Sequence, residues 1–114
     1  MTGIASRYQR IRVIPPHIVA DVVTYPTSDG ERRTAAIAGW GCPCCVSKNQ
    51  PIVGYDGFPL LETEPLEPET RRRLGFVFLS GEEAAEKMRK ARSFYLWAGG
   101  FIGEATVIEE PTAQ

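Results

Sequence analysis

SFYLWAGGFIGEATVIEE, at residues 93–110, is the stretch that decides the fold of this chain of 114 residues. Aromatic and β-branched side chains on both sides of Ala98-Gly99-Gly100 favour two strands. The two glycines between them are typical of a tight hairpin turn. The C-terminal part of the chain therefore predicts an antiparallel β-ribbon, and the segments before it are interpreted in that light.

Further strand patterns precede this ribbon at residues 10–13, 17–25, 32–40, 51–61 and 71–79. In 17–25 one face carries Ile18, Ala20 and Val22, as the two-residue period of a strand requires. In 71–79 one face carries Leu74, Phe76 and Phe78. Six or seven short strands separated by turn residues predict a small antiparallel barrel or sandwich.

One helix is expected near residues 81–91, in a chain that is otherwise β. Ser80 and Glu83 have the spacing of a capping box, in which each side chain bonds to the backbone N–H of the other residue. Acidic residues in the first turn and basic residues in the last turn suit the helix dipole. The apolar stripe is thin, so we expect a surface helix against one end of the sheet structure; it consists of Ala84, Ala85, Met88 and Ala91.

The composition indicates one domain at residues 10–110, with a flexible arm at 1–9 and a frayed tail at 111–114. The net charge of −1 gives no general reason to expect nucleic-acid or membrane binding. No segment resembles a signal peptide or a membrane span. Three cysteines are an odd number for a disulfide framework, so the sequence predicts a cytoplasmic protein with reduced thiols.

Two stretches resemble the hairpins that open and close the C-terminal (third) β-barrel domain of translation elongation factor Tu. Residues 21–40 resemble the opening hairpin, with matches at Gly30, Arg32, Thr34 and Gly39, and with Trp40 where the family has Tyr. Residues 93–109 resemble the closing hairpin, with matches at Phe94, Gly99, Gly100, Gly103 and Val107. The resemblance covers about residues 10–109 and implies an all-β, small closed antiparallel barrel in which the helix is an insertion.

The resemblance also implies what the barrel does. In the factor, this domain helps to hold the T-arm of aminoacyl-tRNA and contacts the nucleotide-exchange factor. The family's basic turn corresponds to Arg32 and Arg33, whereas the family's glutamine contact falls on Pro43. No Gly-x-x-x-x-Gly-Lys-Ser/Thr sequence occurs, so neither binding nor hydrolysis of a nucleoside triphosphate is implied.

All three cysteines lie within GWGCPCC at residues 39–45. Cys42 and Cys45 have Cys-x-x-Cys spacing, and Cys44 with His17 would complete a Cys₃His zinc set. In a regular strand, however, Cys42 and Cys44 face one side and Cys45 the other, so one ion cannot contact all three. A redox pair would need a thiolate stabilised by a cation or a helix N-terminus. We therefore favour three small buried side chains and no cofactor, with a metal or thiol-redox site as the alternative.

Arg32, Arg33 and Trp40 are the candidate partner-binding residues. An RNA site would need arginines that converge beside an exposed aromatic ring. Alternatively, the arginines form a solvated cluster balanced by neighbouring glutamates. No nucleophile lies in a recognisable catalytic pattern, so we expect no enzymatic activity. The resemblance to the factor's third domain implies a non-enzymatic module that binds a protein or structured RNA through the barrel surface.

Overall fold

The fold is built from strands whose side chains alternate between the interior and the outside. The computed structural model describes residues 15–26, 36–37 and 39–108. In chain order its elements are β1 (Ile18–Thr24), β2 (Cys42–Cys45), β3 (Tyr55–Pro59), β4 (Arg71–Phe78), α2 (Glu82–Ala91), β5 (Ser93–Trp97) and β6 (Phe101–Val107). In β1 every second residue is buried, which confirms the predicted face of Ile18, Ala20 and Val22.

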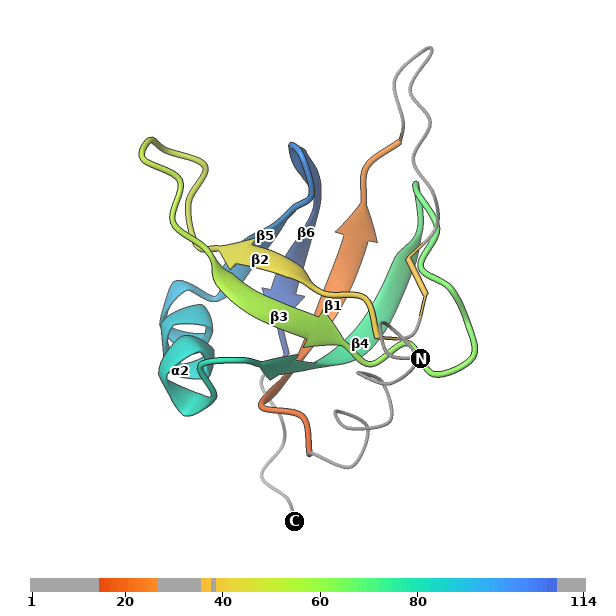
Figure 1. Cartoon of the computed structure of the whole chain (residues 1–114), viewed down its shortest axis with the longest axis horizontal. Coiled ribbons are helices and arrows are strands. Elements are labelled where there is room, and N and C mark those ends of the chain that lie inside the picture. Colours follow the sequence, from red (N-terminus) through yellow and green to blue (C-terminus); the bar gives the residue numbers. More distant parts are fainter. Residues whose placement is uncertain (1–14, 27–35, 38, 109–114) are drawn as a thin grey trace, which may run out of the picture.

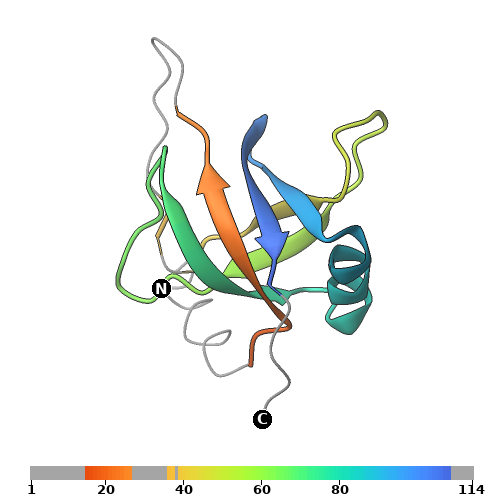
Figure 2. The same ribbon diagram turned by 180° about the vertical axis from the view of Figure 1, so that it is seen from behind.

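The six strands close into a barrel in the order β1-β4-β3-β2-β5-β6, with β6 paired back to β1 (Figures 1 and 2). Every pair is antiparallel. This confirms the predicted all-β closed barrel with one short helix. The predicted C-terminal ribbon is β5 and β6, and they are joined by the turn at residues 98–100.

Three phenylalanine rings fill the interior of the barrel. The rings of Phe76 and Phe94 meet edge to face, with their centroids 5.3 Å apart and their planes at 86°. Phe78 packs beside both of them at centroid distances of 6.1 and 6.3 Å. Phe76 and Phe94 are among the largest fully buried side chains, so they contribute a large apolar area to the core.

The helix α2 lies where β4 ends and β5 begins (Figure 1). Ala84, Ala85 and Met88 join the core of the barrel, as the thin apolar stripe predicts, whereas Ala91 is exposed. The predicted capping box is wrong. Gly81 is the N-cap residue, with φ of 66°, and no side chain caps the helix. Ser80 therefore lies one residue too early to bond to the first turn.

The predicted return strand at 32–40 is also wrong for the residues that the structure describes. Ala36 forms only an isolated bridge with Leu66, through backbone hydrogen bonds of 3.0 and 2.8 Å. The reason is topological, because β4 and β6 occupy the two edges of β1 and leave none for a sequence-local hairpin. The strand predicted at 10–13, the arm at 1–9, the tail at 111–114, Arg32 and Arg33 lie outside the described residues.

Within the described part of the chain, no helix has the length and apolar character needed to cross a membrane.

Gly57 tests how tightly the barrel interior is packed. A Cβ atom at this position would come within 2.8 Å of Cys44 Sγ and 2.9 Å of the Phe78 ring. Because both neighbours are buried, we expect Gly57→Ala to lower the free energy of unfolding by about 1–3 kcal/mol, as overpacked cores do. Urea unfolding measures this change. Thr106→Ala, at an exposed position in β6, is the control and should shift the midpoint little; equal midpoints for the two variants would contradict the packing described here.

Candidate functional site

The cysteine strand β2 places its thiols on both sides of the barrel wall. Cys44 pairs with Leu96 and belongs to the core together with Cys42, whereas Cys45 pairs with Tyr95 on the outer side. All three are buried and free, with exposed fractions of 5%, 0% and 0% for Cys42, Cys44 and Cys45. Their alternation and burial agree with the favoured interpretation of three small space-filling side chains.

The surroundings of Cys44 and Cys45 favour the protonated form of their thiols. A hydrogen bond with Cys42, followed by burial, raises the pKa of the Cys44 thiol well above its ordinary value. Burial raises the pKa of Cys45 as well. The Cys44 thiol also donates to the backbone oxygen of Cys42 at 3.6 Å. Because the thiolate is the nucleophile and the metal ligand, both uses are disfavoured at these two residues.

His17 has a structural contact of its own. Its Nδ1 atom accepts a hydrogen bond of 3.0 Å from the backbone N–H of Phe78. Among residues 15–26, 36–37 and 39–108, no three His, Cys, Asp or Glu side chains are grouped so as to hold a metal ion. The alternative set of His17, Cys42, Cys44 and Cys45 is therefore not assembled in this structure.

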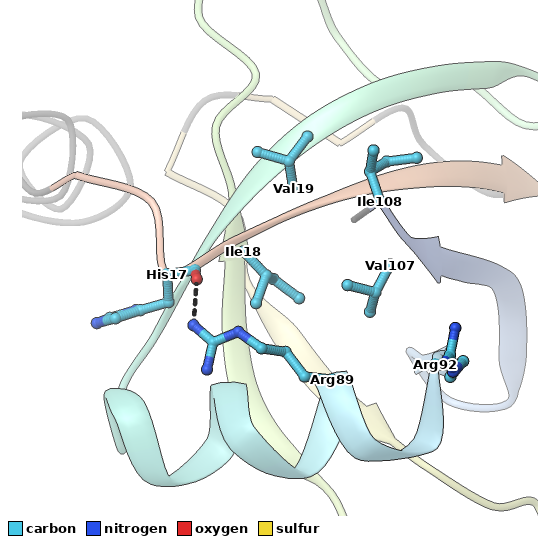
Figure 3. Close-up of a pocket in the computed structure, with 7 residues that line it drawn as sticks. All are labelled: His17, Ile18, Val19, Arg89, Arg92, Val107 and Ile108. Carbon is cyan, nitrogen blue, oxygen red and sulfur yellow. Dashed lines mark hydrogen bonds between the residues drawn. The ribbon is translucent and has the colours of Figure 1, made fainter. Parts of the chain in front are cut away.

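A groove of about 330 Å³ lies between α2 and the place where β1 begins and β6 ends, next to His17 (Figure 3). Its walls are aliphatic, and Arg89 and Arg92 lie along one side. Arg89 donates to the backbone oxygen of His17 at 2.9 Å and also to Glu82. The hydrogen bond from Arg89 lowers the pKa of Glu82. The guanidinium of Arg89 is thus used to hold α2 against β1.

Trp40 is half-buried and packs against the barrel core. Its backbone N–H donates to the oxygen of Ile37 at 2.9 Å. It lines a small cavity of about 90 Å³ together with Thr24, Leu66 and Ala98. Of the three predicted partner-binding residues, the structure therefore places Trp40 at a partly covered position, while Arg32 and Arg33 lie outside the described residues.

Half-buried aromatic side chains gather on the outer face of the barrel, around the β5–β6 hairpin. We call Tyr25, Tyr95, Trp97 and Phe101 the aromatic cluster; each is half-buried. Phe101 contacts Trp97 edge to face at a centroid distance of 4.9 Å and Tyr95 at 6.0 Å. A solvated face of an antiparallel sheet usually carries polar side chains, so this cluster is a candidate recognition surface.

Lys48 lies over this cluster, although it belongs to the loop at residues 46–54 between β2 and β3. Its Nζ atom is 5.0 Å from the ring centroid of Tyr25, 4.8 Å from that of Tyr95 and 5.2 Å from that of Phe101. These distances are within the range of cation–π attraction. Lys48 Nζ donates to the Tyr25 hydroxyl at 3.0 Å, and this hydroxyl donates to Glu104 Oε1 at 3.0 Å.

Sequence reasoning missed the aromatic cluster. Tyr95 and Trp97 alternate with the buried Phe94 and Leu96, so their outward direction follows from the strand period. Tyr25 and Lys48 come from distant parts of the sequence. Closure of the barrel brings both of them next to Tyr95 and Phe101.

No protein-family model matches the chain, and no curated protein or solved structure matches it significantly.

Burial of the thiols predicts slow modification of the native protein. At neutral pH we expect all three cysteines to react with an aromatic disulfide reagent roughly tenfold or more slowly than in the urea-unfolded chain. The absorbance of the released thiolate measures both rates. One rapidly reacting thiol in the native protein would contradict the described burial.

The raised thiol pKa values also predict a loss of stability in alkali. The stabilisation that they provide is complete below the pKa of the unfolded thiols and is lost as the pH rises through the higher folded pKa. We expect the free energy of unfolding to fall between about pH 8 and about pH 10. Urea unfolding across this range should show a shallower fall for Cys44→Ala, whereas Thr106→Ala should keep the wild-type slope.

Proposed function

We propose that this chain is a non-enzymatic binding module that engages a protein through the aromatic cluster. The observation that carries the proposal is the gathering of four half-buried aromatic side chains on an outer strand face. Tyrosine and tryptophan are enriched at interfaces because they bury much apolar area and retain a polar atom for hydrogen bonding. Trp97 is the candidate centre of the interface, since its ring packs on Phe101.

Protein is favoured over structured RNA as the partner. Bases stack on open ring faces, but Phe101 contacts both Tyr95 and Trp97 edge to face. The carboxylate of Glu104 is bonded to Tyr25 inside the cluster, and its negative charge repels phosphates. The overall charge of −1 adds no attraction for a nucleic acid.

The relationship to the third domain of elongation factor Tu remains part of this proposal. It is supported by the sequence stretch at 93–109, which forms the closing β5–β6 hairpin, and by a barrel of the class that the resemblance implies. The described residues of the stretch at 21–40 do not form the opening hairpin of the family, because β1 pairs with β4 and β6. The proposal places the chain in the cytoplasm, because three cysteines are an odd number for a disulfide framework. Within the proposal, the thiols of β2 serve the packing of the barrel and take no part in a reaction.

Capture from a cell lysate by the tagged full chain tests the proposal. Trp97→Ala should weaken binding of the captured protein roughly thirtyfold, because an aromatic residue at the centre of an interface contributes about 2 kcal/mol or more. Phe58→Ala is the matched control, since Phe58 is also a half-buried outer aromatic residue. Phe58 lies in β3, whose neighbours in the barrel are β4 and β2 rather than β5 or β6. Equal loss in both variants would contradict the assigned surface.

Ribonuclease treatment separates the two partner classes in the same experiment. A protein partner predicts capture that survives ribonuclease and the double change Arg32→Ala/Arg33→Ala. If capture is lost both after ribonuclease treatment and in the double variant, the partner is RNA and Arg32 and Arg33 contact it. Circular dichroism and urea unfolding of every variant verify that the barrel is intact.

A further inference from the structure

Three members of the aromatic cluster form a cage, open to solvent on one side, against the ammonium group of the exposed Lys48. Tyr25, Tyr95 and Phe101 each lie with their ring centroid 4.8–5.2 Å from Lys48 Nζ. Tyr95 lies in β5 and Phe101 begins β6, whereas Tyr25 directly follows β1. The backbone N–H of Tyr25 donates to the oxygen of Ile102 in β6 at 2.8 Å, so all three rings are attached to the barrel wall. Lys48, by contrast, belongs to the loop at 46–54, which projects between β2 and β3 (Figure 1). The cage is therefore built on rigid elements, whereas its occupant is on a loop.

In addition to the three ring faces, a carboxylate near the cage favours the binding of a cation. The Tyr25 hydroxyl accepts from Lys48 and passes a hydrogen bond on to the carboxylate of Glu104. This carboxylate places a negative charge two hydrogen bonds from the ammonium. The hydrogen bond to Tyr25 raises the pKa of Lys48, so the occupant stays charged well above neutral pH.

We propose that the cage of Tyr25, Tyr95 and Phe101 binds the methylated ammonium of a lysine side chain on the partner protein, and that Lys48 is its internal competitor. This inference rests on the proposed function, because it assigns a chemical group to the partner at the same surface. The loop must release Lys48 when the partner binds. Val46 and Val53, at its two ends, are 39% and 58% exposed, so little apolar burial fixes the loop in place.

Methylation is what allows a partner's group to displace Lys48. An unmodified lysine of a partner makes the same contacts as Lys48, but Lys48 is tethered and has a high effective concentration at the cage. A methylated ammonium keeps its charge. It is also larger and less strongly hydrated than a free ammonium, which suits contact with three ring faces. Because Lys48 competes with any ligand of the cage, unmodified lysine is excluded and methylated lysine is selected.

Titration of the isotope-labelled full chain, followed by amide NMR, tests this inference. The probes are a short peptide with trimethyllysine, the same peptide with unmodified lysine, choline, and the uncharged tert-butyl analogue of choline. We expect the trimethyllysine peptide to shift the resonances of Tyr25, Lys48, Tyr95 and Phe101. Lys48→Gln should lower the apparent dissociation constant of this peptide about three- to tenfold, because the internal competitor is gone.

Phe101→Leu keeps an apolar side chain but removes one ring, and we expect it to weaken binding about three- to tenfold. Should the uncharged analogue bind as tightly as choline, the cation–π basis is wrong. Should Lys48→Gln leave the affinity for the trimethyllysine peptide unchanged, the role of Lys48 as competitor is wrong. Tighter binding of choline than of the peptide would overturn the assignment to a protein side chain and would make a free quaternary ammonium compound the ligand.

A negative result in the capture experiment and a negative result in this titration contradict different proposals. If Trp97→Ala loses the captured protein but no methylated probe shifts the cage resonances, the binding surface stands and the methylated ligand is wrong. If the probes bind the cage but capture is the same for Trp97→Ala and wild type, the cation site stands and the proposed protein-binding surface is wrong.

Discussion

Phe76 and Phe94 meet edge to face across the interior of the barrel, and the rest of the structure depends on this contact. Their strands, β4 and β5, are three places apart in a ring of six and so lie on opposite sides of it. Joining them through the middle fills the space that closure creates, and closure in turn leaves no strand with a free edge. The helix α2 adds Ala84, Ala85 and Met88 to the same core. One packed interior thus fixes the positions of all six strands.

This closed wall determines which side chains face outward together. The register between β5 and β6 shifts at Leu96 and Trp97, so that Trp97 pairs with Phe101. Pairing of β2 with β5 sets Cys45 opposite Tyr95 and brings the loop of Lys48 beside the hairpin. The aromatic cluster is consequently a product of strand order and register. Its rings are held by backbone pairing, so they are already in place when a partner binds and only the loop of Lys48 has to move.

The cysteines have the spacing of a metal or redox site, but strand geometry and burial disfavour both uses. Cys42, Cys44, Cys45 and His17 are metal ligands by residue type, yet β2 directs Cys44 inward and Cys45 outward. A hydrogen bond with Cys42 together with burial raises the pKa of the Cys44 thiol, and burial raises the pKa of the Cys45 thiol. His17 Nδ1 accepts a hydrogen bond from the backbone N–H of Phe78. The spacing of GWGCPCC is accordingly explained by a strand that needs small side chains on both of its faces.

The sequence by itself determined the elements whose causes are local. The two-residue period in β1 and β4, the glycine turn at 98–100 and the apolar stripe of α2 each follow from neighbouring residues. The capping box failed because Gly81, between Ser80 and the helix, took the N-cap position. The return strand at 32–40 failed because pairing partners are chosen by the whole sheet, and β6 occupies that edge of β1. Only the tertiary structure decided that Tyr25, Lys48, Tyr95 and Phe101 would meet, because barrel closure joins residues that no local pattern connects.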